Sequence, residues 1–132
     1  VSLPYQPFSE IKYSLSAADV HVVSIGDDVV GIVHPCKVYG AMAVSRPVLT
    51  FGPKPSHVSD LVEQHKIGWH ISHGDVDAAE KALRAMLTTP EEQLRAMGER
   101  AASVVATSLS KKALCGEFTD IMLKGLPETT RA

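Results

Sequence analysis

The chain has 132 residues, of which 45% are hydrophobic and 21% are charged, and this composition is typical of one ordinary globular domain. Thirteen basic against fifteen acidic residues give a formal net charge of −2, which excludes the basic surface typical of nucleic-acid-binding proteins. Cys36 and Cys115 are too few for a disulfide framework, and no apolar run of about 18 residues is present to span a membrane.

The N-terminal part of the chain predicts a strand, a helix and a second strand. A short strand at residues 1–3 leads into residues 4–7, which two prolines hold extended. Residues 9–18 carry apolar side chains at helical spacing. Residues 20–25 are nearly all apolar, which predicts a strand covered on both faces, with His21 as a core or edge residue whose ring is hydrogen-bonded.

The next loop contains two adjacent aspartates, Asp27 and Asp28. Paired carboxylates can hold a divalent metal, but they lack further oxygen ligands nearby, and we interpret them as a solvated turn. After the loop, Pro35 is expected to be the first residue of a helix that runs to about Ser45. The spacing predicts one buried face of this helix, formed by Val38, Ala41, Met42 and Ser45.

The start of this helix is a candidate anion site. The backbone N–H groups of Cys36, Lys37 and Val38 are expected to lack intrahelical partners and to lie at the positive end of the helix dipole, and Lys37 adds a mobile positive charge. Many such junctions bind nothing, so the spacing alone leaves both outcomes open. Gly40 is unfavourable inside a helix, which indicates a close approach to its backbone by a neighbouring strand or by a bound ligand.

The rest of the chain continues the alternation of strands and helices. We expect a strand at residues 48–51, a helix capped by Ser56, a strand at 68–72 after a Gly68 C-cap, and three helices that begin near Asp75, Pro90 and Ser110. The pattern predicts an α/β fold, a three-layer Rossmann-like parallel sheet with about four strands here, followed by C-terminal helices. Residues 1–124 form the predicted domain, and 125–132 a flexible tail.

The sequence shows no obvious metal site or catalytic triad. Four histidines, at positions 57, 65, 70 and 73, lack partners at ligand spacing, and we interpret them as scattered surface residues. No serine lies in a Gly-x-Ser-x-Gly motif, and neither cysteine has an evident base. The sequence patterns therefore leave the catalytic residues unidentified, and no metal or cofactor is expected.

A longer stretch carries a family resemblance. Residues 35–49, Pro-Cys-Lys-Val-Tyr-Gly-Ala-Met-Ala-Val-Ser-Arg-Pro-Val-Leu, resemble the Pro-Ser-Lys-Leu-Tyr-x-x-x-Ala-x-Gly-Arg-Pro-Val-Leu segment of retaining GT-B glycosyltransferases. This family includes glycogen and sucrose synthases and bacterial polysaccharide transferases. Residues 3–20, 68–71 and 74–83 also resemble its C-terminal, donor-binding domain, so the likeness covers residues 1–124.

The resemblance implies an N-terminally truncated nucleotide-sugar-binding domain and a role for each part of the site. Cys36, Lys37 and Val38 would contact the donor diphosphate, and Gly40 would closely approach the ribose. The sugar would face Gly31, Ile32, Val33 and His34. The base would lie beside Pro4, Tyr5 and Gln6. The family's two glutamates fall at Ile32 and Gly40, so this chain lacks both.

The hypothesis is therefore the donor half of a glycosyltransferase in cell-surface polysaccharide or glycolipid synthesis, inactive alone because the acceptor domain is missing. The expected partners are a nucleotide-sugar donor, that N-terminal domain and a second copy through self-association, with no nucleic acid. The expected location is the cytoplasm, or the inner face of the membrane for the full-length protein. The alternatives are a flavodoxin-like or receiver-like binding module and a degenerate transferase domain.

Overall fold

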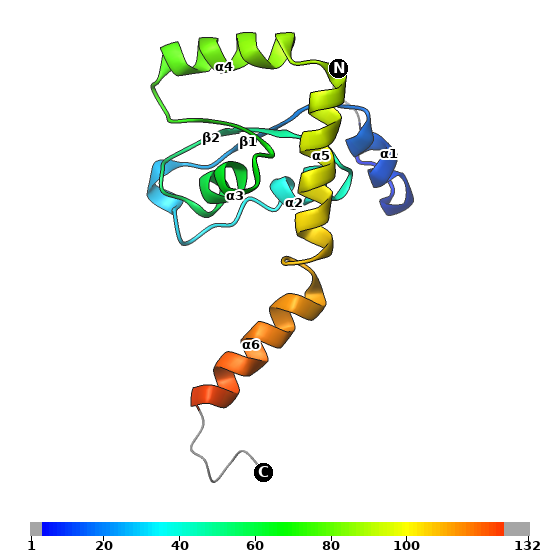
Figure 1. The fold of residues 1–132 in the computed structure, drawn as a ribbon, viewed down its shortest axis with the longest axis vertical. Helices are drawn as coiled ribbons and strands as arrows, with labels where there is room; N and C mark the ends of the chain where they lie inside the picture. Colours follow the sequence, from blue (N-terminus) through cyan, green and yellow to red (C-terminus); the bar gives the residue numbers. More distant parts are fainter. Residues whose placement is uncertain (1–3, 126–132) are drawn as a thin grey trace.

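The computed structural model describes residues 4–125 and has a mixed α/β architecture (Figure 1). Strands β1 (His21–Ser24), β2 (Val48–Phe51) and β3 (Gly68–Ile71) form a parallel sheet in the order β1-β2-β3. The predicted parallel α/β fold is confirmed, with three strands in the described part of the chain. The further strand expected at residues 1–3 lies outside the described residues.

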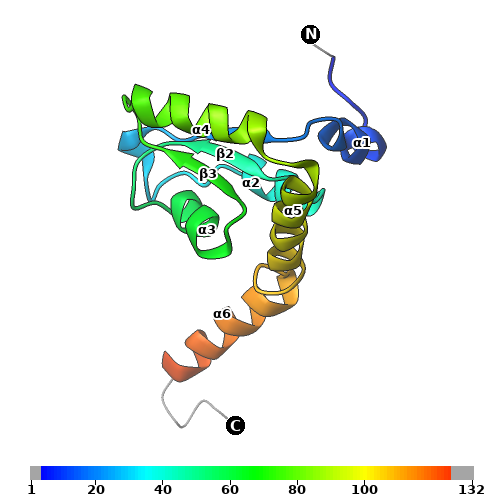
Figure 2. The ribbon, with the colours of Figure 1, turned by 45° about the horizontal axis from the view of Figure 1, so that its top comes forward.

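Helices lie on both faces of the sheet, as predicted. Helices α2 (Lys37–Ala43) and α3 (His57–His65) cover one face, and α4 (Val76–Thr88) lies over the other (Figure 2). Helix α5 (Glu91–Ala106) packs across α2 and also contacts α3. A 3-10 turn, η1 (Phe8–Glu10), leads into α1 (Ile11–Ser16), which lies against α2.

The core lies between the sheet, α2, α3 and α5. Its buried side chains come from one face of each helix and from the strands, and the largest of those that are fully buried are Met42, Leu49, Ile67 and Ile71. The predicted face of α2 is confirmed at Val38, Ala41 and Met42, which are all fully buried, whereas Ser45 lies beyond the end of the helix and is exposed. The apolar spacing in the sequence therefore located the buried face of α2 correctly.

Helix α3 begins as the sequence predicts. The Ser56 side chain accepts a hydrogen bond from the Ser59 backbone N–H at 3.2 Å, and the Ser59 side chain accepts one from the Ser56 N–H at 2.8 Å. This reciprocal capping box satisfies backbone donors at the helix start. The predicted C-cap is wrong, because Lys66, with φ of 52°, terminates the helix, whereas Gly68 is the first residue of β3.

Two predicted buried faces are exposed in the structure. Strand β1 is covered on one face only, since Val23 is buried while Val22 is 62% exposed. Helix α4 has no buried residue, and Val76 and Leu87 on its predicted apolar face are largely exposed. Both elements have apolar sequences, but α4 lies mainly over β3 and leaves these side chains exposed. His21 is hydrogen-bonded as expected, with Nε2 at 2.8 Å from the Leu15 carbonyl oxygen.

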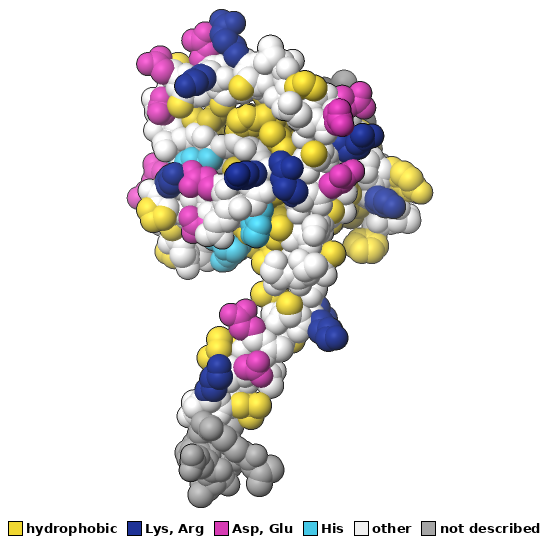
Figure 3. Space-filling view, viewed as in Figure 1, with side chains coloured by type: hydrophobic (Ala, Val, Ile, Leu, Met, Phe, Trp, Pro, Cys, Tyr) yellow, Lys and Arg dark blue, Asp and Glu magenta, His cyan; other side chains and the backbone are white. Residues whose placement is uncertain are grey.

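Helix α6 (Lys111–Gly125) projects away from the rest of the molecule (Figure 1). Its predicted apolar face is exposed, and Figure 3 shows hydrophobic side chains interspersed with charged ones along it. Its exposed large apolar side chains are Leu114, Phe118, Ile121, Met122 and Leu123. Within residues 4–125, no helix has both the length and the hydropathy needed to cross a membrane. Of the predicted tail, residues 125–132, Gly125 ends α6, and residues 126–132 lie outside the described residues.

Candidate functional site

The candidate site lies at the edge of the sheet where the three parallel strands end. The loop after β1 leads to α2, and the loop after β2 leads to α3, so both helices begin at this edge. In open parallel sheets, ligands bind outside the carboxyl ends of the strands. The predicted donor-binding loop, residues 26–36, therefore occupies the edge at which a ligand would be expected.

The residues expected to face the donor sugar lie in an exposed turn. The turn follows η2 (Asp27–Val29) and is held by two backbone hydrogen bonds to the Val29 carbonyl oxygen, from Ile32 at 3.1 Å and from Val33 at 3.0 Å. Gly31 has a positive φ of 79°, a conformation that favours glycine. Ile32 is 79% exposed and His34 is also exposed, so this turn is open to solvent.

The start of α2 differs from the prediction in one donor. The helix begins at Lys37, after Pro35, because the Val38 N–H donates to the Pro35 carbonyl oxygen at 3.1 Å and closes a tight first turn. The expectation that Val38 presents a free N–H is therefore wrong. The N–H groups of Cys36 and Lys37 have no hydrogen-bond acceptor within residues 4–125, and both residues are exposed.

Gly40 has a neighbour other than the two expected. A Cβ built at this position would lie 3.4 Å from Leu15 Cδ1 of α1, an ordinary contact, and no strand lies against it. The structure also keeps the predicted base-adjacent residues away from the loop. The N-terminal segment that contains residues 4–6 leads into α1, at the opposite end of the strands from the loop of residues 26–36 (Figure 1, Figure 2). Tyr5 is 99% exposed.

A cluster of three side chains, His34, Tyr39 and His57, links the starts of α2 and α3. Tyr39 Oη lies 2.8 Å from His57 Nε2 and 3.5 Å from His34 Nδ1. The two imidazole rings meet edge to face, with centroids 4.6 Å apart. Figure 3 shows histidine side chains grouped at the surface beside α3. His57 is exposed, as expected for a surface histidine, but it is not isolated, because its ring contacts Tyr39 and His34.

Burial changes the acidity of two members of this cluster. Burial raises the pKa of the Tyr39 phenol, and the nearby Cys36 raises it further, so the hydroxyl keeps its proton at neutral pH. Burial, and next the imidazole of His34, lower the pKa of His57, while the Asp60 carboxylate acts in the opposite direction. His57 is therefore neutral at pH 7 and able to accept a hydrogen bond from Tyr39.

Sequence reasoning missed this cluster although a signal exists. His34 precedes α2 and His57 is the first residue of α3, and each helix follows one of two adjacent parallel strands. Residues that open helices after adjacent parallel strands meet at the same edge of the sheet. Placing each histidine relative to the predicted helix starts would have brought His34 and His57 together.

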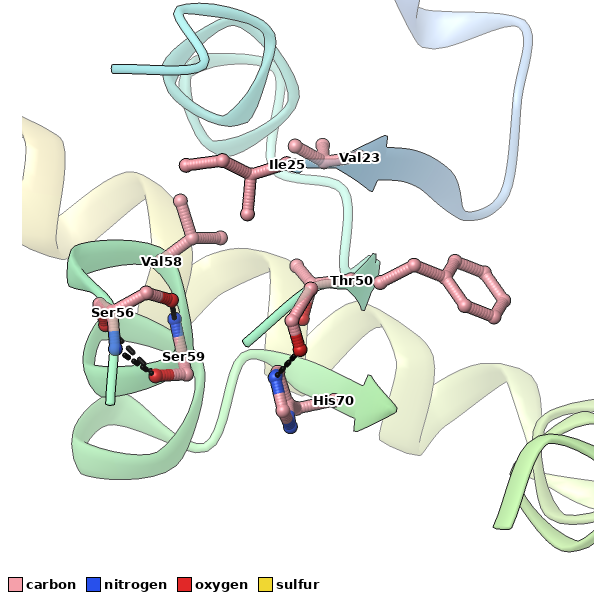
Figure 4. Close-up of a pocket in the computed structure, with 9 residues that line it drawn as sticks. Val23, Ile25, Thr50, Ser56, Val58, Ser59 and His70 are labelled. Atoms are coloured by element: carbon pink, nitrogen blue, oxygen red, sulfur yellow. Dashed lines mark hydrogen bonds between the residues drawn. The ribbon is translucent and has the colours of Figure 1, made fainter. Parts of the chain in front are cut away.

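His70 and Thr50 make side-chain hydrogen bonds to backbone carbonyl groups at the sheet. His70 Nε2 lies 3.1 Å from the Gly52 carbonyl oxygen, and Thr50 donates to the Trp69 carbonyl oxygen at 3.1 Å. Figure 4 shows Val23, Thr50, Ser59 and His70 converging between β2 and α3; the side chains leave no room there for a water molecule. This gap is therefore too small to hold a ligand and is part of the packing between the sheet and α3.

His73 closes the loop after β3 onto the loop after β1. Its Nε2 atom lies 2.8 Å from the Ile25 carbonyl oxygen and 4.0 Å from Asp27 Oδ1. Beside it, a depression of about 220 Å³ lies between the end of the sheet and α4, with Phe51, Ile71 and Val76 among its lining residues. Asp27 and Asp28 lie in the predicted turn, and the described residues contain no group of three or more His, Cys, Asp or Glu side chains that could hold a metal ion.

Comparison with known proteins finds a partial relative. The chain is 30% identical over 69 residues to probable glycosyltransferase WbjE of Pseudomonas aeruginosa, and this match covers 52% of the chain and 17% of that protein. The matched segment therefore spans less than a fifth of the length of this relative. No protein-family model matches the chain, and no solved structure matches it. The comparison therefore supports a relation to glycosyltransferases and does not identify the donor or the acceptor.

Proposed function

We propose that this chain is the donor-binding portion of a GT-B glycosyltransferase that transfers a sugar from a nucleoside diphosphate sugar to an acceptor. The observation that carries the proposal is the 30% identity over 69 residues with a probable glycosyltransferase. The parallel α/β sheet, with an open loop at the carboxyl ends of its strands, supports it. Cell-surface polysaccharide or glycolipid synthesis is the proposed setting.

The chemistry proposed for the loop is stabilisation of the leaving group. Negative charge builds on the nucleoside diphosphate as the bond to the sugar breaks, and fixed donors aimed at that charge lower the barrier. The unpaired N–H groups of Cys36 and Lys37 and the exposed Lys37 ammonium are the groups that would meet the diphosphate. No metal is needed for this role in the proposal.

The remaining contacts in the proposal follow from the exposed turn. Gly31, Ile32, Val33 and His34 would face the donor sugar, since they line the loop that runs into the diphosphate contacts. Acceptor binding is assigned to a separate N-terminal domain of the full-length protein. The chain by itself is therefore expected to bind a nucleoside diphosphate weakly and to transfer no sugar.

Calorimetric titration with UDP tests the proposal. We expect Lys37→Gln to weaken UDP binding about five- to ten-fold, because it removes one charge-assisted contact to phosphate. Lys81→Gln is the matched control, because Lys81 is exposed on α4 and lies outside the proposed site. Equal affinities for the two variants, or the absence of UDP binding in the unmodified chain, would contradict the proposal.

NMR titrations of the chain with Mg²⁺ and with UDP distinguish the proposal from a receiver-like module. A receiver-like module would bind Mg²⁺ at its aspartates, so the amide signals of Asp27 and Asp28 would shift with Mg²⁺ and be insensitive to UDP. A degenerate transferase domain is the remaining alternative, since Ile32 and Gly40 replace the two family glutamates. UDP binding by the chain together with no sugar transfer by the full-length protein would favour it.

A further inference from the structure

The cluster of His34, Tyr39 and His57 has unused hydrogen-bonding capacity. The Tyr39 hydroxyl lies between His34 Nδ1 and His57 Nε2, at 3.5 and 2.8 Å. The opposite nitrogens, His34 Nε2 and His57 Nδ1, have no hydrogen-bond partner within residues 4–125. A neutral imidazole carries one N–H and an imidazolium carries two, so both rings have a donor to offer when they are protonated.

The cluster resists double protonation when it is empty. The ring centroids of His34 and His57 are 4.6 Å apart, so two imidazolium charges would repel each other at close range. Two charged or titratable groups change the pKa of His57 besides burial. The imidazole of His34, in the loop before α2, lowers it, and the carboxylate of Asp60, in α3, raises it. Tyr39 is the other titratable residue in contact with His57, and the nearby Cys36 raises the pKa of Tyr39.

An anion that accepts hydrogen bonds from His34 Nε2 and His57 Nδ1, the nitrogens not occupied by Tyr39, would reverse this balance. A phosphate group accepts hydrogen bonds at several oxygens and offsets both positive charges. Lys37 follows His34 by three residues in the chain and is exposed, so its ammonium group would add positive charge to the same part of the surface. The two imidazoles would then be most positive in the presence of the ligand.

We propose that His34 and His57 together bind a phosphate group of a diphosphate ligand and take up protons when they do so. The inference rests on the proposed function in naming the ligand, which is the diphosphate of the nucleotide-sugar donor. Its consequence is that affinity rises as the pH falls toward about 6, in the range where histidines titrate. The Tyr39 hydroxyl lies within hydrogen-bond distance of both rings and so links them.

Calorimetry with inorganic pyrophosphate, and in parallel with UDP, at about pH 6 and about pH 8 tests the proposal. Phosphate itself gains a proton near a pKa of about 6, but this effect is the same for every protein variant and cancels in the comparison. From pH 8 to pH 6, pyrophosphate affinity is expected to rise about ten-fold more in the unmodified chain than in the His34→Asn, His57→Asn double variant. His65→Asn, in the last turn of α3, is the control and keeps the full pH dependence.

A second measurement follows the imidazole proton signals by NMR. Pyrophosphate is expected to shift the ring signals of His34 and His57 and to leave those of His65 in place. Equal pH dependence of pyrophosphate affinity in all variants, or no change in the ring signals of His34 and His57, would overturn the proposal.

The two ligands separate this proposal from the proposed function. UDP binding that weakens in Lys37→Gln but has the same pH dependence in all the histidine variants overturns the histidine pair and leaves the proposed function standing. Pyrophosphate binding by the pair, with UDP bound no more tightly than pyrophosphate and no effect of Lys37→Gln, supports the pair and contradicts the proposed function. Absence of binding by either ligand overturns both.

Discussion

The two ends of helix α2 differ in how their backbone groups are satisfied. At the C-terminal end, Ser45 has a φ of 57°, its N–H donates to the Met42 carbonyl oxygen at 3.1 Å, and the Arg46 N–H donates to the Ala41 carbonyl oxygen at 3.0 Å. This pair of bonds is a Schellman motif, which satisfies the last carbonyl groups of the helix. At the N-terminal end, the Cys36 and Lys37 N–H groups have no partner within residues 4–125.

Neighbouring elements reinforce this difference. The C-terminal end is covered by α5, whose Gly98 lies directly against the Ser45 carbonyl group, and the Arg46 side chain donates to the Ser16 carbonyl oxygen at 2.7 Å. The N-terminal end follows an exposed loop at the carboxyl edge of the sheet. The C-terminal end of α2, the closed end, is therefore fixed by packing. The N-terminal end, the open end, keeps its backbone donors available for a ligand.

The largest expected effect comes from breaking the closed end. In Gly98→Ala, the new Cβ would lie 1.9 Å from the Ser45 carbonyl oxygen, so α5 and α2 would have to move apart. We expect the free energy of unfolding to fall by about 3 kcal/mol, as in overpacked cores, measured by urea denaturation.

Gly116→Ala is the matched control for that substitution. Gly116 lies within α6 with open space around its Cβ position, so alanine should stabilise the helix by up to about 1 kcal/mol. Equal destabilisation by the two substitutions would contradict the close contact between α5 and the end of α2.

A smaller effect is expected from relieving strain at the same end. Ser45 adopts the left-handed conformation in which a Cβ is unfavourable, so Ser45→Gly should raise the free energy of unfolding by about 1 kcal/mol. Ser103→Gly, within α5, should instead lower it by about 0.5 kcal/mol, because glycine is a poor helix former. A loss of stability in Ser45→Gly would show that the Schellman motif is not formed.

The smallest expected effect concerns the open end and its pH dependence. The pKa of His57 is lowered by burial first and by His34 second, so the unfolded chain binds more protons than the folded chain. Stability is then lost as the pH falls through about 6.5, the ordinary value for histidine. Thermal unfolding should show a midpoint that drops between about pH 7.5 and about pH 5.5, and drops less in His57→Asn. An equal drop in both proteins would contradict this assignment.

Local patterns in the sequence were sufficient to predict most of the fold. Apolar runs identified the strands, Ser56 identified the start of α3, and helical spacing identified the buried face of α2. These features depend on neighbours in the chain, such as the side-chain cap and the periodicity of one face. Such patterns indicate that a face is apolar but not which element covers it, and the exposed faces of α4 and α6 are examples.

The candidate site depended more on tertiary contacts. The loop and the start of α2 were located from the sequence, but the bond between Val38 and Pro35 depends on the turn geometry, and it removes one expected donor. The contact between Gly98 and Ser45 joins residues far apart in the chain. The link from His34 to His57 through Tyr39 likewise requires the relative placement of two helices.

The most direct test of the open end as a diphosphate-binding site is a titration of the isotope-labelled chain with UDP, followed through the backbone amide signals. The account predicts progressive shifts for residues 31–40 and for His57, with the signals of Ser45, Arg46 and Gly98 at the closed end unchanged. Shifts confined to other parts of the molecule, or no shifts at millimolar UDP, would contradict it.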